Sequence, residues 1–128
     1  MCCIELYWAA WHGHDAQALV SLYALDGVYQ DPLTDKPLKG MAIGTHACTF
    51  WEALPDLRFA LTETLRADGL IAVTWTLNGV CTGMWQGVPP SGRTICLPGA
   101  THFQIVQRRI RSVQSYFDVK TLLEQLDF

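Results

Sequence analysis

The sequence has little charge, no long apolar run and no excess of basic residues. Of its 128 residues, nine are Lys or Arg and twelve are Asp or Glu, which gives a net charge of −3. A weakly acidic chain offers no electrostatic surface for DNA or RNA. No stretch of about 20 apolar residues is present, so no membrane span is expected. Half of the residues are apolar and five are Trp, which excludes a disordered chain. The length predicts a single domain, residues 1–128.

The five cysteines indicate neither a disulfide framework nor a metal site. Their number is odd, and Glu5 and His12 interrupt the apolar N-terminal segment, so it is not typical of a signal peptide. We therefore expect reduced thiols and a cytoplasmic location. No Cys-x-x-Cys or His-Glu-x-x-His spacing occurs, so no metal is expected. Cys81 and Cys96 lie in apolar, strand-like runs and are interpreted as core residues.

The first half of the chain has helical spacing. Residues 4–11 carry apolar side chains at i, i+3, i+4 and i+7, on one face of a helix that Gly13 ends. Asp15 is placed to cap a second helix, whose apolar face is expected to reach Tyr23. A short strand at 28–30 and a loop at 31–40 follow. A third helix has Ala47, Phe50, Trp51 and Leu54 on one face and ends at Pro55.

From Leu57 the apolar period changes from helical spacing to strict alternation, which predicts strands. Asp68–Gly69 marks a hairpin, and long strands are expected at 70–85, 94–106 and 110–117. Pro98–Gly99 is expected to form a bulge. A short helix at 119–126 ends the chain. Helices followed by a meander of strands define an α+β fold. We expect a cone-shaped, curved antiparallel (mixed) sheet wrapped over three N-terminal helices, with an apolar pocket inside.

Several stretches, taken together in this order, resemble the SnoaL-like polyketide cyclases of the nuclear transport factor two-like superfamily. The more specific ones are Gly-Val-Pro-Pro-Ser-Gly at 87–92 and Tyr-Phe-Asp-Val-Lys-Thr-Leu-Leu-Glu-Gln-Leu at 116–126. The resemblance covers nearly the whole chain. Two departures stand out: Gln107-Arg-Arg-Ile110 replaces the usual Asp-Gly turn, and Gln114 replaces a Trp of the last strand.

The resemblance implies ring closure by intramolecular aldol condensation, without a metal or organic cofactor. It implies that Asp118 is the acid/base and that His102 polarises the substrate, although Gln104 could occupy the equivalent position. A base beside a carbonyl substrate needs a dry pocket, which raises the pKa of a carboxylate. The alternative for Asp118 is the N-cap of the terminal helix. The alternative for His102 and Gln104 is a pair bonded to neighbours or water.

Other candidate substrate-binding residues come from the strand pattern and from the tryptophans. Gln114 and Tyr116 share a strand face with Asp118, and Tyr29 shares one with Asp31. For Asp31 the alternative is a turn before Pro32. The candidates that could line a pocket for a planar ligand, or simply form the core, are Trp51, Trp75 and Trp85.

These observations favour a small cofactor-free cyclase that binds an apolar or aromatic oxygenated molecule. Two alternatives remain: a non-catalytic ligand-binding or dimerisation module, and a ketosteroid-isomerase-like isomerase or hydrolase in the same pocket. His102 and Gln104 alternate with Phe103 and Ile105, so both faces of this strand are expected to be covered. We therefore expect a homodimer.

Overall fold

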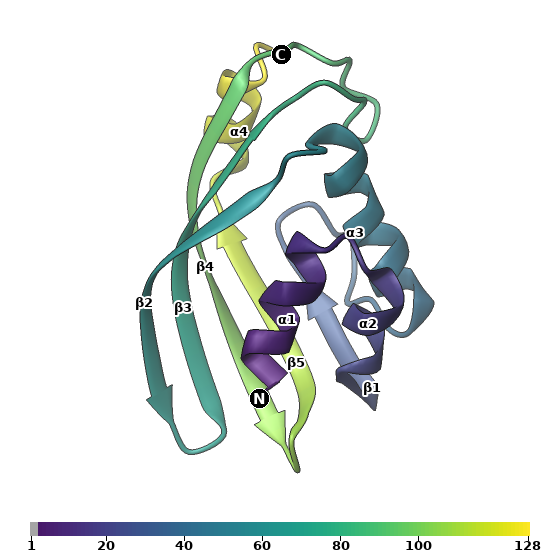
Figure 1. Cartoon of the computed structure of the whole chain (residues 1–128), viewed down its shortest axis with the longest axis vertical. Helices are drawn as coiled ribbons and strands as arrows, with labels where there is room; N and C mark the ends of the chain where they lie inside the picture. The colour runs from purple at the N-terminus through teal and green to yellow at the C-terminus, as the bar shows by residue number, and fades with distance from the viewer. Residues whose placement is uncertain (1–2) are drawn as a thin grey trace.

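The computed structural model describes residues 3–128; Met1 and Cys2 lie outside the described residues. The elements follow the order α1 (Cys3–His12), α2 (Ala16–Ser21), β1 (Tyr23–Gln30), α3 (Met41–Ala53), β2 (Arg58–Ala67), β3 (Leu70–Val80), β4 (Thr94–Val106), β5 (Arg109–Phe117) and α4 (Val119–Gln125). The strands form one curved sheet in the order β1-β5-β4-β3-β2, in which only the β1–β5 pair is parallel. Figure 1 shows α1, α2 and α3 on one side of this sheet and α4 near its end. The α+β prediction is confirmed.

The N-terminal helices form where the spacing predicted them. The predicted face of α1 is buried, and Tyr7 packs edge-on against Phe103 of β4 with ring centroids 4.9 Å apart. Asp15 caps α2, since its carboxylate accepts a hydrogen bond from the Ala18 amide at 3.0 Å. The helix ends at Ser21, however, so Tyr23 begins β1 instead of completing the helix face.

Two strand boundaries differ from the prediction. The strand β1 begins at Tyr23 instead of residue 28, so Asp26 and Gly27 lie inside the strand, at a register shift against β5. Pairing with β5 brings the backbone so close that a Cβ on Gly27 would lie 2.6 Å from the Ile110 carbonyl oxygen. The strand β3 ends at Val80 instead of residue 85. The backbone amide of Cys81 then donates a hydrogen bond to the Arg93 carbonyl, across the following loop.

The predicted bounds of β4 are confirmed, but the predicted bulge at Pro98–Gly99 is wrong. The ladder is regular there, and the register shift lies between Gln104 and Ile105. Only glycine fits at position 99, because a side chain there would collide with the Trp75 ring and with the Tyr116 carbonyl oxygen. Cys81 is buried as expected, whereas Cys96 is exposed.

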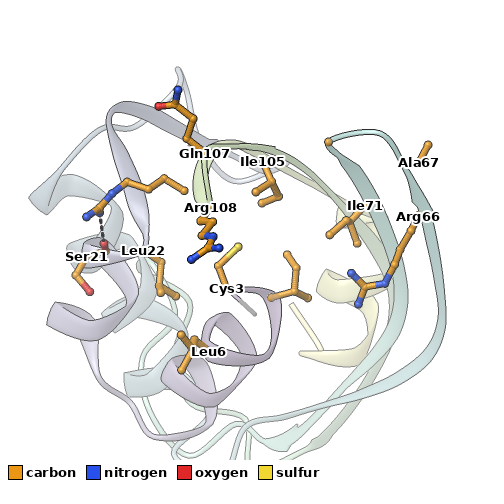
Figure 2. A pocket seen from close by; sticks show the side chains of 13 residues that line it. Cys3, Leu6, Ser21, Leu22, Arg66, Ala67, Ile71, Ile105, Gln107 and Arg108 are labelled. Carbon is orange, nitrogen blue, oxygen red and sulfur yellow. Dashed lines mark hydrogen bonds between the residues drawn. The ribbon is translucent and has the colours of Figure 1, made fainter. Parts of the chain in front are cut away.

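The concave face of the sheet and the helices enclose an aromatic core. At the end of the cone where the β2–β3 and β4–β5 turns lie, a cavity of about 1010 Å³ remains open (Figure 2). No helix in residues 3–128 is long and apolar enough to cross a membrane.

Candidate functional site

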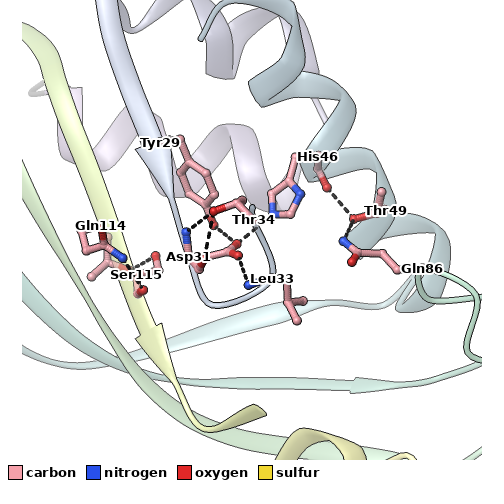
Figure 3. Close-up of polar contacts among 10 residues, drawn as sticks. Tyr29, Asp31, Leu33, Thr34, His46, Thr49, Gln86, Gln114 and Ser115 are labelled. Atoms are coloured by element: carbon pink, nitrogen blue, oxygen red, sulfur yellow. Dashed lines mark hydrogen bonds and ion pairs between the residues drawn. The ribbon is translucent and has the colours of Figure 1, made fainter. Parts of the chain in front are cut away.

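A carboxylate is buried inside the cone, at the end of β1. Asp31 is 3% exposed, and its Oδ2 accepts a hydrogen bond from the Tyr29 hydroxyl at 2.6 Å. His46 Nε2 lies 2.8 Å from the same oxygen (Figure 3). A carboxylate oxygen only accepts, so His46 must carry its proton on Nε2. We call these three residues the Tyr29–Asp31–His46 cluster.

The local sequence explains how these side chains meet. Asp31 forms an Asx turn as β1 ends, with its Oδ1 accepting from the Leu33 amide at 2.7 Å. Tyr29 stays in the strand and pairs with Leu38, which folds the intervening loop back over β1. His46 lies four residues before Phe50, on the buried face of α3. The predicted turn role of Asp31 is thus present, and it uses only one of the two carboxylate oxygens.

Three buried tyrosine hydroxyls are held in the protonated form. Burial raises the pKa of Tyr29 well above its ordinary value, and the charge of Asp31 adds to the effect. Burial likewise raises the pKa of Tyr7, to which Asp31 contributes, and that of Tyr23. These phenols therefore stay protonated at any physiological pH.

A second polar group lies across the cone on the sheet. The Thr101 and Ser115 hydroxyls are 2.8 Å apart, and Trp75 Nε1 donates to Thr101 at 2.9 Å. Together with Tyr7 and Tyr29 these residues line a central cavity of about 10 Å³. That volume holds about one water molecule. Aromatic side chains fill the rest: Trp8, Trp11, Phe50, Phe59 and Phe117.

Asp118 lies outside this interior, at the N-cap of α4. Its carboxylate accepts from the Thr121 hydroxyl at 2.6 Å and from the Lys120 amide at 3.3 Å. The Thr121 hydroxyl is the main reason that the pKa of Asp118 is lowered, and the side chain is exposed. A base in a dry pocket would have the opposite properties, so the geometry matches the capping alternative.

The other strand candidates lie on the convex face of the sheet. His102 and Gln104 are exposed, because Phe103 between them is fully buried against the helices. His102 Nε2 lies 2.9 Å from the Tyr116 hydroxyl, which connects β4 with β5 on that outer face. Gln114 faces the same way, directly opposite His102 in the ladder. These four residues do not meet the Tyr29–Asp31–His46 cluster.

The tryptophans are core residues, and one of them also lines the central cavity. Trp75 is the one that lines the central cavity. Trp51 donates its Nε1 hydrogen to the Trp11 carbonyl at 2.9 Å, and its ring packs against Trp11. Trp85 packs on Phe50 and is 2% exposed. Neither Trp51 nor Trp85 lines the central cavity.

The sequence interpretation missed His46, Thr101 and Ser115. His46 could have been found from helical spacing, because it shares the predicted face of Phe50. Thr101 and Ser115 could have been found once Phe103 and Val113 fixed which strand faces point inward. Among residues 3–128, no three His, Cys, Asp or Glu side chains lie close enough together to hold a metal ion.

A curved mixed sheet packed on three helices, with polar groups buried inside, defines the class of small cone-shaped α+β proteins. A family model, SnoaL-like polyketide cyclase, matches residues 2–126. The chain belongs to this family. No curated protein matches the sequence.

Solved structures share the fold at low sequence identity. A candidate SnoaL-like polyketide cyclase from Jannaschia sp. CCS1 superposes with a TM-score of 0.86 at 16% identity, over 97% of this chain and 88% of that one. IdmH, a candidate polyketide cyclase from Streptomyces antibioticus, superposes with a TM-score of 0.80 at 22% identity, over 98% of this chain and 96% of that one. AclR, a candidate hydroxylase from Streptomyces galilaeus, superposes with a TM-score of 0.84 at 18% identity, over 98% of this chain and 78% of that one. At these identities the likeness shows the fold alone.

Proposed function

We propose that this protein catalyses cofactor-free proton transfer at a carbon beside a carbonyl group, as cyclisation or isomerisation requires, on an apolar oxygenated molecule. The observation that carries the proposal is the buried carboxylate of Asp31, which two side chains bond within the cone. Family membership supports a reaction of this class. A buried, oriented carboxylate is the kind of group that general-base catalysis uses.

In this proposal Asp31 is the final proton acceptor. Tyr29 lines the central cavity and bonds to Asp31, so its hydroxyl connects the cavity with the carboxylate. The Tyr29 oxygen takes the proton from the substrate carbon while its own proton passes to Asp31 Oδ2. Tyr7, which also lines the cavity and stays protonated, donates a hydrogen bond to the enolate oxygen that forms. His46 is a positioning residue, because its hydrogen bond goes to Asp31 and it does not line the central cavity.

The sequence-based assignment gives a competing arrangement, with Asp118 as the acid/base and His102 as its helper. It stays a prediction. In the present geometry it needs a substrate bound outside the cone, on the side where α4 begins, since Asp118 is exposed there. A variant of each aspartate distinguishes the two arrangements.

A second candidate function is ligand binding without chemistry. The observation that favours it is the filled cone, whose central cavity of about 10 Å³ is far smaller than a substrate. Catalysis in the cone therefore requires the aromatic side chains around the cavity to move apart when the substrate enters.

The test uses 2-tetralone, an apolar ketone with exchangeable C–H protons, in deuterated buffer. Proton NMR measures its deuterium uptake with wild-type protein, with Asp31→Asn and without protein. Acceleration that Asp31→Asn lowers by about 10²-fold or more supports the enzyme. Calorimetric binding of 2-tetralone without any acceleration supports the binding module, and acceleration that Asp31→Asn leaves intact overturns the assignment of the base.

The expected homodimer and cytoplasmic location belong to the proposal too. The convex face of the sheet is where a second copy is expected, because Tyr116 is 53% exposed there.

A further inference from the structure

The open end of the cone has a cavity that is separate from the central one. It lies between the start of α1, the end of α2 and the β2–β3 and β4–β5 turns. No described residue lines both cavities. Its volume of about 1010 Å³ is that of a site for a small organic molecule.

The wall of this cavity is aliphatic. The apolar residues that line it are Ile4, Leu6, Leu22, Ile71 and Ile105. No aromatic side chain of the described chain takes part, in contrast to the core of the cone. The wall therefore offers apolar contact to a flexible chain and no stacking surface for a planar ring.

The rim of the cavity is cationic. Arg66 at the end of β2 and Arg108 in the β4–β5 turn both line it (Figure 2). No carboxylate oxygen of residues 3–128 lies within 4 Å of either guanidinium group. The acidic neighbours in sequence, Glu5 and Asp68, are not part of the lining. Guanidinium groups bind carboxylates through paired hydrogen bonds.

A third arginine is already fixed in place. Arg109 Nη1 donates to the Ser21 carbonyl at 3.0 Å, which ties the β4–β5 turn to the end of α2. This contact holds the turn over the cavity and leaves Arg66 and Arg108 as the two arginines available for a ligand.

The backbone of the β4–β5 turn is strained at Arg108 and at the residue before it. Gln107 and Arg108 have φ angles of 52° and 66°, in the left-handed region. Two-residue turns of this kind favour Asn and Gly, because a side chain crowds the backbone there. An Arg kept in such a conformation at the edge of a cavity indicates a role for its side chain.

We propose that this cavity binds an acyl chain that ends in a carboxylate. The aliphatic wall takes the hydrocarbon chain, and Arg66 and Arg108 take the carboxylate. The proposal does not depend on the reaction in the cone, because the two cavities share no lining residue.

Calorimetry with decanoate and with decanol, which has the same chain length but no charge, tests the proposal. We expect decanoate to bind at least tenfold more tightly than decanol. Arg108→Gly and Arg66→Gln should each weaken decanoate binding at least tenfold, and Arg108→Gly should also raise the melting temperature, because it relieves the turn.

Two control variants separate charge from strain. Gln86→Gly changes another residue with a left-handed backbone, with a φ of 47°, which lies outside the cavity lining; it should raise the melting temperature and leave decanoate affinity unchanged. Arg111→Gln removes a charge three residues beyond Arg108 in the same hairpin, outside the cavity lining. This variant should also leave the affinity for decanoate unchanged. Absence of decanoate binding, equal binding of decanol, or full affinity in Arg108→Gly and Arg66→Gln would overturn the proposal.

Discussion

The Tyr29 hydroxyl donates to Asp31 Oδ2 over 2.6 Å, and both side chains are buried. The two residues alternate on one strand face, which the sequence already indicated. The structure adds His46 on the same oxygen. The hydroxyl and the imidazole compensate for the cost of keeping a carboxylate away from water.

Replacing Tyr29 by Phe should destabilise the protein. The change removes one hydrogen bond to a buried charged group, which costs about 1.5–3 kcal/mol of the free energy of unfolding. Urea denaturation measures the loss. The matched control is Tyr23→Phe, because the buried Tyr23 hydroxyl has no hydrogen-bond partner among residues 3–128. That change should leave stability equal or slightly higher, and equal losses in both variants would contradict the importance of the Asp31 contact.

A histidine connects α1 to β2 and should make stability depend on pH. His12 Nε2 accepts a hydrogen bond from the Phe59 amide at 3.0 Å, so the neutral ring is required. Burial, and then the charge of Arg58, lowers the pKa of His12 in the folded protein. A lowered folded pKa means that this contribution to stability is complete above the ordinary pKa of His, and is lost as the pH falls through the folded value.

The variant His12→Gln keeps an acceptor that does not titrate. Its stability should therefore fall less than that of the wild type when the pH is lowered from 7.5 to 5.5. Urea denaturation at these two pH values gives the comparison. Parallel losses in both proteins would show that His12 does not carry the effect.

Asp118 should behave as a helix cap. Its pKa is lowered chiefly by the Thr121 hydroxyl, so its contribution to stability is present above the ordinary pKa of Asp and lost in acid. Asp118→Ala should lower the melting temperature at pH 7, whereas Asp118→Ser, which supplies another capping oxygen, should largely retain it. Equal melting temperatures for the Ala variant and the wild type would argue against the cap.

The outer sheet face should carry the dimer contact. We expect a dimer mass in light scattering for the wild type and a monomer for Tyr116→Asp, because an unpaired charge is costly in an interface. The control is Met84→Asp, which changes an exposed residue of the loop after β3. A wild-type monomer, or a dimeric Tyr116→Asp, would contradict the expectation.

The periodic parts of the fold could be predicted from the sequence, and the site only in part. The face of α1 and the bounds of β4 follow from spacing, since burial imposes a period on each element. Tyr29 and Asp31 could be paired for the same reason. His46 lies on a helix 15 residues away from Asp31, and no local pattern shows that the two meet.

The direction of the β4 face depended on tertiary packing. Alternation puts His102 and Gln104 on one face of the strand, but it does not decide which face is buried. Contact of Phe103 with Tyr7 of α1 decides that the polar pair points outward. The glycine at 99 likewise reflects the ring of Trp75 across the ladder, which local turn preferences do not contain.

The most direct test of the acid–base account compares the two aspartates in one assay. Deuterium uptake by 2-tetralone is measured with Asp31→Asn and with Asp118→Asn, after both variants have been shown by circular dichroism to be folded. The account predicts a loss of about 10²-fold or more for Asp31→Asn and a rate within about twofold of wild type for Asp118→Asn. The reverse result, with Asp118→Asn inactive and Asp31→Asn active, would contradict it.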